Sequence, residues 1–307
     1  MRIRNFVIAA GLVVAGLCVT SPSALSASPS DTSAANQVVN EITAVAGTSS
    51  VVPASQTTTD SDSAAIASTG GATVDVPKDP SAGIAVTTSD GTAISIGIAN
   101  DDSARDANPT KSGTMVFNDP TSSSSVAVQV ITNGVRELFA LNNADAPTDF
   151  SVPLDLPAGA SLIANDEGGY DIVTLDANGT ASTQAVISAP WATDANGRSL
   201  PTSYTLDGTT LTQHIDTSGA AFPVIADPKV DWGWTSYTVY FSWRETKLLA
   251  LGGTIAQWIP TPWTVIGGRI IAVWAGIAVA TDRCVKIKYN WYVNPQAGYY
   301  TDGYCKT

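Results

Sequence analysis

Residues 126–141, VAVQVITNGVRELFAL, decide the fold class of this 307-residue chain. Apolar side chains alternate along two runs, and the Asn133-Gly134 pair between them is one that type I′ hairpin turns favour. Comparable turn signals separate other strand-like runs, at 89–92, 167–169, 176–179 and 206–209. Many short strands without a clear helix predict an antiparallel β-sandwich-like domain over residues 81–228, so the expected fold class is mainly β.

Charge and aromatic content divide the chain near residue 228. Residues 28–228 carry five basic and 23 acidic side chains, a net charge of −18, whereas residues 229–307 carry eight basic and four acidic, a net of +4. Seven of the eight tryptophans also follow residue 228. The composition therefore predicts a C-terminal aromatic α+β module at 229–307. The acidic bulk of the chain disfavours nucleic acid as a partner.

The first 27 residues have the features of a cleavable secretory signal. Arg2 and Arg4 precede an uncharged apolar run at 6–19, which helix breakers and a small-residue tract follow at 21–27. We therefore expect an exported protein, secreted or extracellular and in part envelope-associated. Residues 28–80 are rich in Ser, Thr and Ala and have no aromatic side chain, which predicts a disordered linker. Weak helical periodicity at 36–45 does not change this interpretation, because an isolated helix of that length is marginal.

The C-terminal module has a pattern of strand, helix pair and strands. Residues 235–241 alternate as a strand, and Ser242 with Glu245 fits a capping box that starts a helix. That helix should end before Pro260, and Thr261-Pro262 should open a second one that reaches about residue 280. The result is a hydrophobic helical hairpin. Strands at 284–289 and 299–305 complete a β-αα-β-β unit, with the two lysines of the first strand, Lys286 and Lys288, facing outward.

Two cysteines remain after the expected loss of Cys18 with the signal. Cys284 and Cys305 are an even pair in a protein bound for an oxidising compartment, so they should form a disulfide. Two free thiols are disfavoured by the compartment. A zinc site is disfavoured because His214 is the chain's one histidine and could supply only a third ligand.

The hairpin at 243–280 carries the clearest hint of a contact surface. Residues 248–280 contain a single charge, Arg269, and the tail 270–280 is wholly apolar. Its candidate contacts to a membrane or a partner are Trp258, Trp263, Arg269 and Trp274. Burial beneath the flanking strands is the favoured interpretation, because apolar runs of 10 to 14 residues usually form core.

No catalytic residue, metal site or cofactor is expected from the acidic domain. His214 shares a strand face with Thr212 and Asp216, which allows a His–Asp dyad, but no nucleophile-elbow motif accompanies it and a solvated surface pair is favoured. The Asp-Ala-Asn-Gly tetrads at 176–179 and 194–197 lack the spacing of calcium loops. They are interpreted as tight turns.

Motifs near the end of the acidic domain resemble a known family. The stretches 189–198 (APWATDANGR), 200–204 (LPTSY) and 222–228 (FPVIADP) resemble a β-rich module of secreted actinobacterial proteins that have no assigned activity. The resemblance covers roughly residues 125–228. The short Cys-containing C-terminal region, with Glu-Thr-Lys at 245–247 and Gly-Tyr-Cys at 303–305, is similar to C-terminal regions of the same proteins. The resemblance implies a boundary near residue 228 and no site residues.

Three hypotheses of function follow from the sequence. The first is a secreted, non-enzymatic protein with a binding role outside the cell or at the cell envelope. The second is a membrane-active, bacteriocin-like effector whose cationic hairpin acts on an anionic membrane surface. The third is a hydrolase of envelope polymers, supported only by the many aspartates, which turns and solubility explain equally well.

Overall fold

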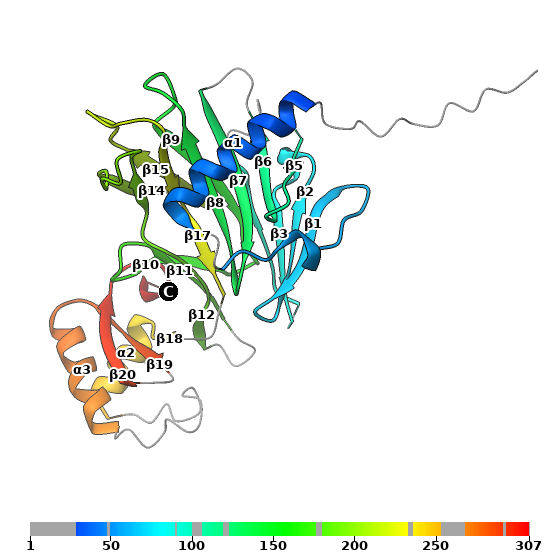
Figure 1. Ribbon diagram of the computed structural model, residues 1–307. Helices are drawn as coiled ribbons and strands as arrows, with labels where there is room; N and C mark the ends of the chain where they lie inside the picture. The colour runs from blue at the N-terminus through cyan, green and yellow to red at the C-terminus, as the bar shows by residue number, and fades with distance from the viewer. Residues whose placement is uncertain are drawn as a thin grey trace, which may run out of the picture.

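Two antiparallel sheets form the core of the computed structural model (Figure 1). The structure describes residues 29–47, 50–89, 91–99, 106–118, 123–175, 180–232, 236–252, 268–290 and 293–306. The first sheet has the order β1 (Ser63–Thr69), β2 (Ala72–Pro77), β3 (Ile84–Thr88), β4 (Ala93–Ile96), β9 (Asp149–Asp155), β15 (Thr210–Ile215) and β14 (Thr202–Asp207). The mainly β, antiparallel class predicted from the sequence is confirmed.

The second sheet extends from the sandwich into the C-terminal module. Its order is β20 (Val293–Tyr300), β19 (Cys284–Asn290), β18 (Ser236–Tyr240), β12 (Ala181–Ile187), β17 (Lys229–Asp231), β8 (Gly134–Leu141), β7 (Ser124–Ile131), β6 (Thr114–Asn118) and β5 (Asn108–Pro109). Four more strands attach beside this path: β10 (Ser161–Ala164), β11 (Tyr170–Leu175), β13 (Trp191–Thr193) and β16 (Val224–Asp227). Because β17 pairs with both β8 and β12, the sandwich continues past residue 228.

The hairpin at 126–141 forms, with a turn one residue earlier than predicted. Ile131 pairs with Gly134, so the loop residues are Thr132 and Asn133. Asn133 takes the left-handed conformation with φ of 63°. Gly134 is needed for another reason: a Cβ there would lie 2.6 Å from the carbonyl oxygen of Val230 in β17. The glycine lets β17 approach the start of β8.

Both faces of β7 and β8 are buried, which alternation alone does not predict. On one face Phe139 stacks on Phe150 of the first sheet, with ring centroids 4.2 Å apart, inside the sandwich core. The other face packs beneath a helix, through a cluster made of Val116, Ala127, Leu138, Ala140 and Ile225. Covering both faces makes this hairpin the centre of the domain.

The prediction of a disordered linker over 28–80 is wrong. Residues Pro29–Ala46 form helix α1, which lies across the second sheet, and β1 and β2 belong to the first sheet (Figure 1). Ile42 is fully buried in the cluster beneath the helix, and Arg136 donates hydrogen bonds to the carbonyl oxygens of Ala46 and Gly47. The sheet face and the guanidinium supply the stabilisation that an isolated helix lacks.

The C-terminal module packs two helices on one face of β18 and β19. Helix α2 (Trp243–Ala250) begins at the predicted capping box of Ser242 and Glu245, and helix α3 is Gly268–Ala280. Their inward residues share one apolar cluster with the strands: Val239, Phe241, Leu249, Ile271, Ala275, Ala278, Val285, Ile287 and Tyr289. Gly252, with φ of 79°, follows α2, so that helix ends at Ala250 rather than just before Pro260. Residues 253–267 lie outside the described part of the chain.

The predicted disulfide is present. Cys284 at the start of β19 bonds to Cys305, and their Cα atoms are 5.6 Å apart. Cys305 lies in the short 3-10 helix Gly303–Lys306, which begins three residues after the last residue of β20, and both cysteines are buried beside Ile163 of β10 and Tyr240 of β18. The cross-link therefore lies where the module meets the sandwich.

Candidate binding cleft between the sandwich and the C-terminal module

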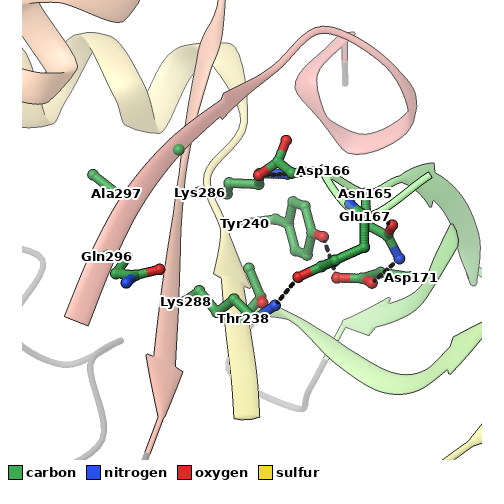
Figure 2. Close-up of a pocket in the computed structure, with 11 residues that line it drawn as sticks. Asn165, Asp166, Glu167, Asp171, Thr238, Tyr240, Lys286, Lys288, Gln296 and Ala297 are labelled. Atoms are coloured by element: carbon green, nitrogen blue, oxygen red, sulfur yellow. Dashed lines mark hydrogen bonds and ion pairs between the residues drawn. The ribbon is translucent and has the colours of Figure 1, made fainter. Parts of the chain in front are cut away.

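Two neighbouring cavities lie between the β10–β11 turn and the C-terminal strands. Their volumes are about 70 and 200 Å³, and they share five lining residues: Asn165, Glu167, Asp171, Thr238 and Lys288. We call them together the seam cleft. Figure 2 shows that its charged side chains come from both sides, from the β10–β11 turn and β11 of the sandwich and from β19.

Asp171 is the fixed carboxylate of the seam cleft. Its Oδ2 accepts a hydrogen bond of 2.5 Å from the Tyr240 hydroxyl and one of 3.3 Å from Thr183, while its Oδ1 accepts from Asn165 Nδ2 at 3.1 Å. Burial raises the pKa of Tyr240 far above its ordinary value, and the negative charge of Asp171 adds to this. The phenol therefore stays protonated and remains a donor to the carboxylate.

Two lysines of β19 reach across the seam to the turn. Lys286 Nζ lies 3.1 Å from Asp166, and Lys288 Nζ lies 2.6 Å from Glu167. The Lys286 side chain is only 7% exposed, whereas its partner Asp166 is 78% exposed. The prediction that both lysines face outward is wrong for Lys286, because β20 and the turn cover it.

A glycine makes room for the buried lysine. A Cβ at Gly298 of β20 would lie 2.9 Å from Cε of Lys286 and 3.6 Å from the Asp166 carboxylate. Glycine inside a strand often marks such a close approach. The sequence signal for this site was therefore present in Gly298 and in Lys286, but it could not be interpreted without knowing which strand lies beside them.

Turn chemistry places the two acidic partners. Asn165 Oδ1 accepts hydrogen bonds from the backbone N–H groups of Glu167 and Gly169, and Gly168 has φ of 92°. These bonds hold Asp166 and Glu167 at the tip of the turn, above β19. The sequence predicts the turn at 167–169 but not what the turn contacts.

The arrangement suits binding of a polar molecule rather than proton transfer. Each carboxylate in the seam cleft accepts from a positioned donor, and each ammonium faces a carboxylate. Exposed ion pairs contribute only about 0–1 kcal/mol, so a ligand that replaces the Lys288–Glu167 pair meets little resistance. In the described part of the chain, no group of three or more His, Cys, Asp or Glu side chains is placed to hold a metal ion.

The structure does not bring the predicted contact residues into this cleft. Trp258 and Trp263 lie outside the described residues. Arg269 belongs to helix α3, and only its backbone is described. Trp274 is half-buried on the same helix, on the other face of the β18–β20 strands from the cleft. In the described chain, no helix combines the length and the apolar character that a membrane crossing requires.

His214 has a different acidic partner from the one predicted. Its Nδ1 lies 2.8 Å from the Asp149 carboxylate of β9, and its Nε2 lies 2.7 Å from the Thr205 hydroxyl of β14. Asp216 instead accepts a hydrogen bond from the backbone N–H of Ser218. The strand register explains the difference, because Asp149 is directly opposite His214. The side chains of His214, Asp149 and Thr205 lie on the face of the first sheet that is open to solvent.

The tetrad at 194–197 is a turn organised by a buried carboxylate. Asp194 accepts hydrogen bonds from the backbone N–H groups of Asn196, Arg198 and Ala221 and from the guanidinium of Arg198. Those donors occupy both of its oxygens. The other tetrad, 176–179, lies outside the described residues.

Comparisons with known proteins add little to this geometry. No protein-family model matches the chain. No curated protein matches its sequence. A glycoside hydrolase of family 81 from Clostridium thermocellum, solved in a mutant form, aligns over 63% of this chain at 12% identity with a TM-score of 0.29. The match spans 32% of that protein's length, and a likeness this weak carries no argument about function.

Proposed function

We propose that this chain is a secreted, non-enzymatic protein that binds a small polar ligand of the cell envelope in the seam cleft. The observation that carries this proposal is the paired charge of the cleft, with carboxylates on the turn and ammonium groups on β19. The disulfide at the same junction is consistent with an oxidising compartment.

The ligand that fits the cleft carries charges of both signs. A ligand carboxylate can replace Glu167 beside Lys288, and a ligand ammonium can take the place of that lysine beside Glu167. Thr238, Gln296 and Asn165 add neutral hydrogen-bonding groups to the lining. Peptidoglycan fragments with a peptide stem combine ammonium, carboxylate, amide and hydroxyl groups. We therefore take a muropeptide as the probe ligand.

Isothermal titration with a purified muropeptide tests the proposal. We expect the muropeptide to bind the mature protein, and neutral chitotetraose not to bind. The paired change Glu167→Gln with Lys288→Met should weaken binding by at least about tenfold, because it removes charge-assisted hydrogen bonds worth roughly 1.5–3 kcal/mol.

A second ion pair of the module supplies the matched control. The paired change Asp302→Asn with Lys306→Met removes an exposed pair at 3.8 Å outside the cleft and should leave binding unchanged. The absence of heat with the muropeptide, or an equal loss in both double variants, would contradict the proposal.

The Asp149–His214–Thr205 array gives the hydrolase alternative a specific test. An imidazole between a carboxylate and a hydroxyl is the arrangement of a nucleophilic triad, but here Asp149 is 62% exposed and water competes for every bond. We expect the protein to release no p-nitrophenol from p-nitrophenyl acetate above the buffer rate, and His214→Ala to change nothing. Release that disappears in both His214→Ala and Thr205→Ala would favour the hydrolase instead.

A further inference from the structure

Apolar side chains are exposed on the two helices of the C-terminal module. The described chain has five large hydrophobic residues that are exposed, and four of them lie on or just after these helices: Leu248 at 47%, Leu251 at 85%, Val273 at 61% and Ile277 at 47%. We call these four residues the apolar surface. The fifth, Leu175 at 49%, ends β11 of the sandwich.

From Ile271 onward, helix α3 is apolar on both of its faces. Ile271, Ala275 and Ala278 pack inward on β18 and β19, whereas Val273 and Ile277 are one turn apart on the opposite side. A surface helix normally carries charged or polar side chains on its outer face. Apart from Arg269 in its first turn, α3 carries no charged residue, which is typical of a helix that lies against a second apolar phase.

Cationic side chains accompany the apolar surface. Arg244 and Lys247 are exposed on α2, one and four residues after the half-buried Trp243, and Lys247 Nζ lies 5.5 Å from the centre of the Trp243 ring. Arg283 is exposed just after α3. Exposed apolar side chains, a tryptophan and basic groups together are typical of segments that lie in a membrane interface.

The charge distribution of the chain favours an anionic membrane over a second copy of the chain as the partner. The module at 229–307 has a net charge of +4, and residues 28–228 have −18. Two copies that met through the same apolar surface would bring two cationic modules together, so self-association is disfavoured electrostatically. An anionic bilayer attracts the module, while it repels the acidic sandwich and so orients the protein.

We propose that the apolar surface docks the protein onto an anionic membrane, with α2 and α3 lying in the interface and the sandwich held away from it. Helix α3 has 13 residues and is about 20 Å long, which suits a position along the interface rather than across the bilayer. Leu251 and Val273 enter the acyl region, and Arg244 and Lys247 contact the lipid phosphates. This docking is independent of ligand binding in the seam cleft.

Vesicle co-sedimentation of the mature full-length protein tests the docking. We expect the protein to sediment with vesicles of phosphatidylglycerol and phosphatidylcholine mixed in equal parts, and at least about tenfold less with phosphatidylcholine alone. Raising the salt to about 0.5 M should release part of the bound protein, because salt screens the attraction to the phosphates. The double variant Leu251→Gln with Val273→Gln should lose binding by roughly tenfold, because two exposed anchors become polar.

Leu175→Gln is the control, since it removes the exposed hydrophobic residue of the sandwich, at 49%, and should leave vesicle binding unchanged. Muropeptide titration of the double variant, with an unchanged result, shows that the fold and the cleft are intact. Equal binding to neutral vesicles, an equal loss in Leu175→Gln, or a monomer–dimer shift in the double variant without vesicle binding by the wild type would each overturn the proposal.

Discussion

Removal of the Cys284–Cys305 disulfide is expected to lower the free energy of unfolding of the C-terminal module by about 2–5 kcal/mol. The bond closes a loop of 21 residues in sequence that contains all of β19 and β20. Without it the unfolded module gains conformational freedom, while the folded module loses a buried contact beside Tyr240 and Tyr300. A large effect is expected because the module's own apolar cluster is small compared with that of the sandwich.

The double variant Cys284→Ala with Cys305→Ala separates the cross-link from thiol chemistry. Urea unfolding, followed by tryptophan fluorescence, should change from one transition to two, because Trp191 and Trp232 report on the sandwich whereas Trp243 and Trp274 report on the module. The wild type in a reducing agent should behave as the double variant does. A single transition at the wild-type midpoint in both samples would show that the module is stable without the bond.

Local sequence patterns predict the elements that local chemistry controls. The hairpin at 126–141, the capping box of Ser242 and Glu245 and the disulfide all depend on residue type and spacing, and all are present. The turn of the hairpin is offset by one residue because Gly134 is required by the neighbouring β17, which no local pattern reveals.

Features that depend on contacts between distant segments are not predicted. Helix α1 has apolar residues at helical spacing, but its stability comes from a sheet face and from Arg136, which lies 90 residues later in the chain. The seam cleft likewise depends on a turn at 165–169 that meets a strand more than a hundred residues away, as in the Glu167–Lys288 pair. Alternation assigned Lys286 to the correct face of its strand but could not show that another segment covers that face.

Asp227→Asn is expected to change the pH dependence of stability. The free energy of unfolding of the variant should increase relative to that of the wild type as the pH rises from 4 to 7. Asp227 is 2% exposed at the C-terminal end of β16, and burial raises the pKa of its carboxyl from 3.8 to about 7. The Trp191 indole N–H and the cations of Arg136 and Lys229 oppose this rise, and Asp231 adds to it. The folded protein therefore keeps a proton that the unfolded chain releases.

That proton fixes the direction of the effect. Because the folded state binds more protons than the unfolded state between about pH 4 and 7, the free energy of unfolding falls as the pH rises through this window, by up to about 4 kcal/mol. The asparagine side chain of the Asp227→Asn variant can still accept a hydrogen bond from the Trp191 indole, but it does not ionise. The variant therefore lacks this fall in the free energy of unfolding. Urea unfolding of both proteins at several pH values measures the difference.

Asp216→Asn provides the control with the opposite sign. Hydrogen bonds from Ser218 lower the pKa of the Asp216 carboxyl, so any stability that it contributes is lost only as the pH falls below about 4. The difference in free energy of unfolding between Asp216→Asn and the wild type should therefore stay constant from pH 4 to 7. Over the same range, the difference between Asp227→Asn and the wild type rises. Parallel curves for the wild type and Asp227→Asn would mean that the carboxylate at 227 is ionised throughout, held by Arg136 and Trp191 strongly enough to offset its burial.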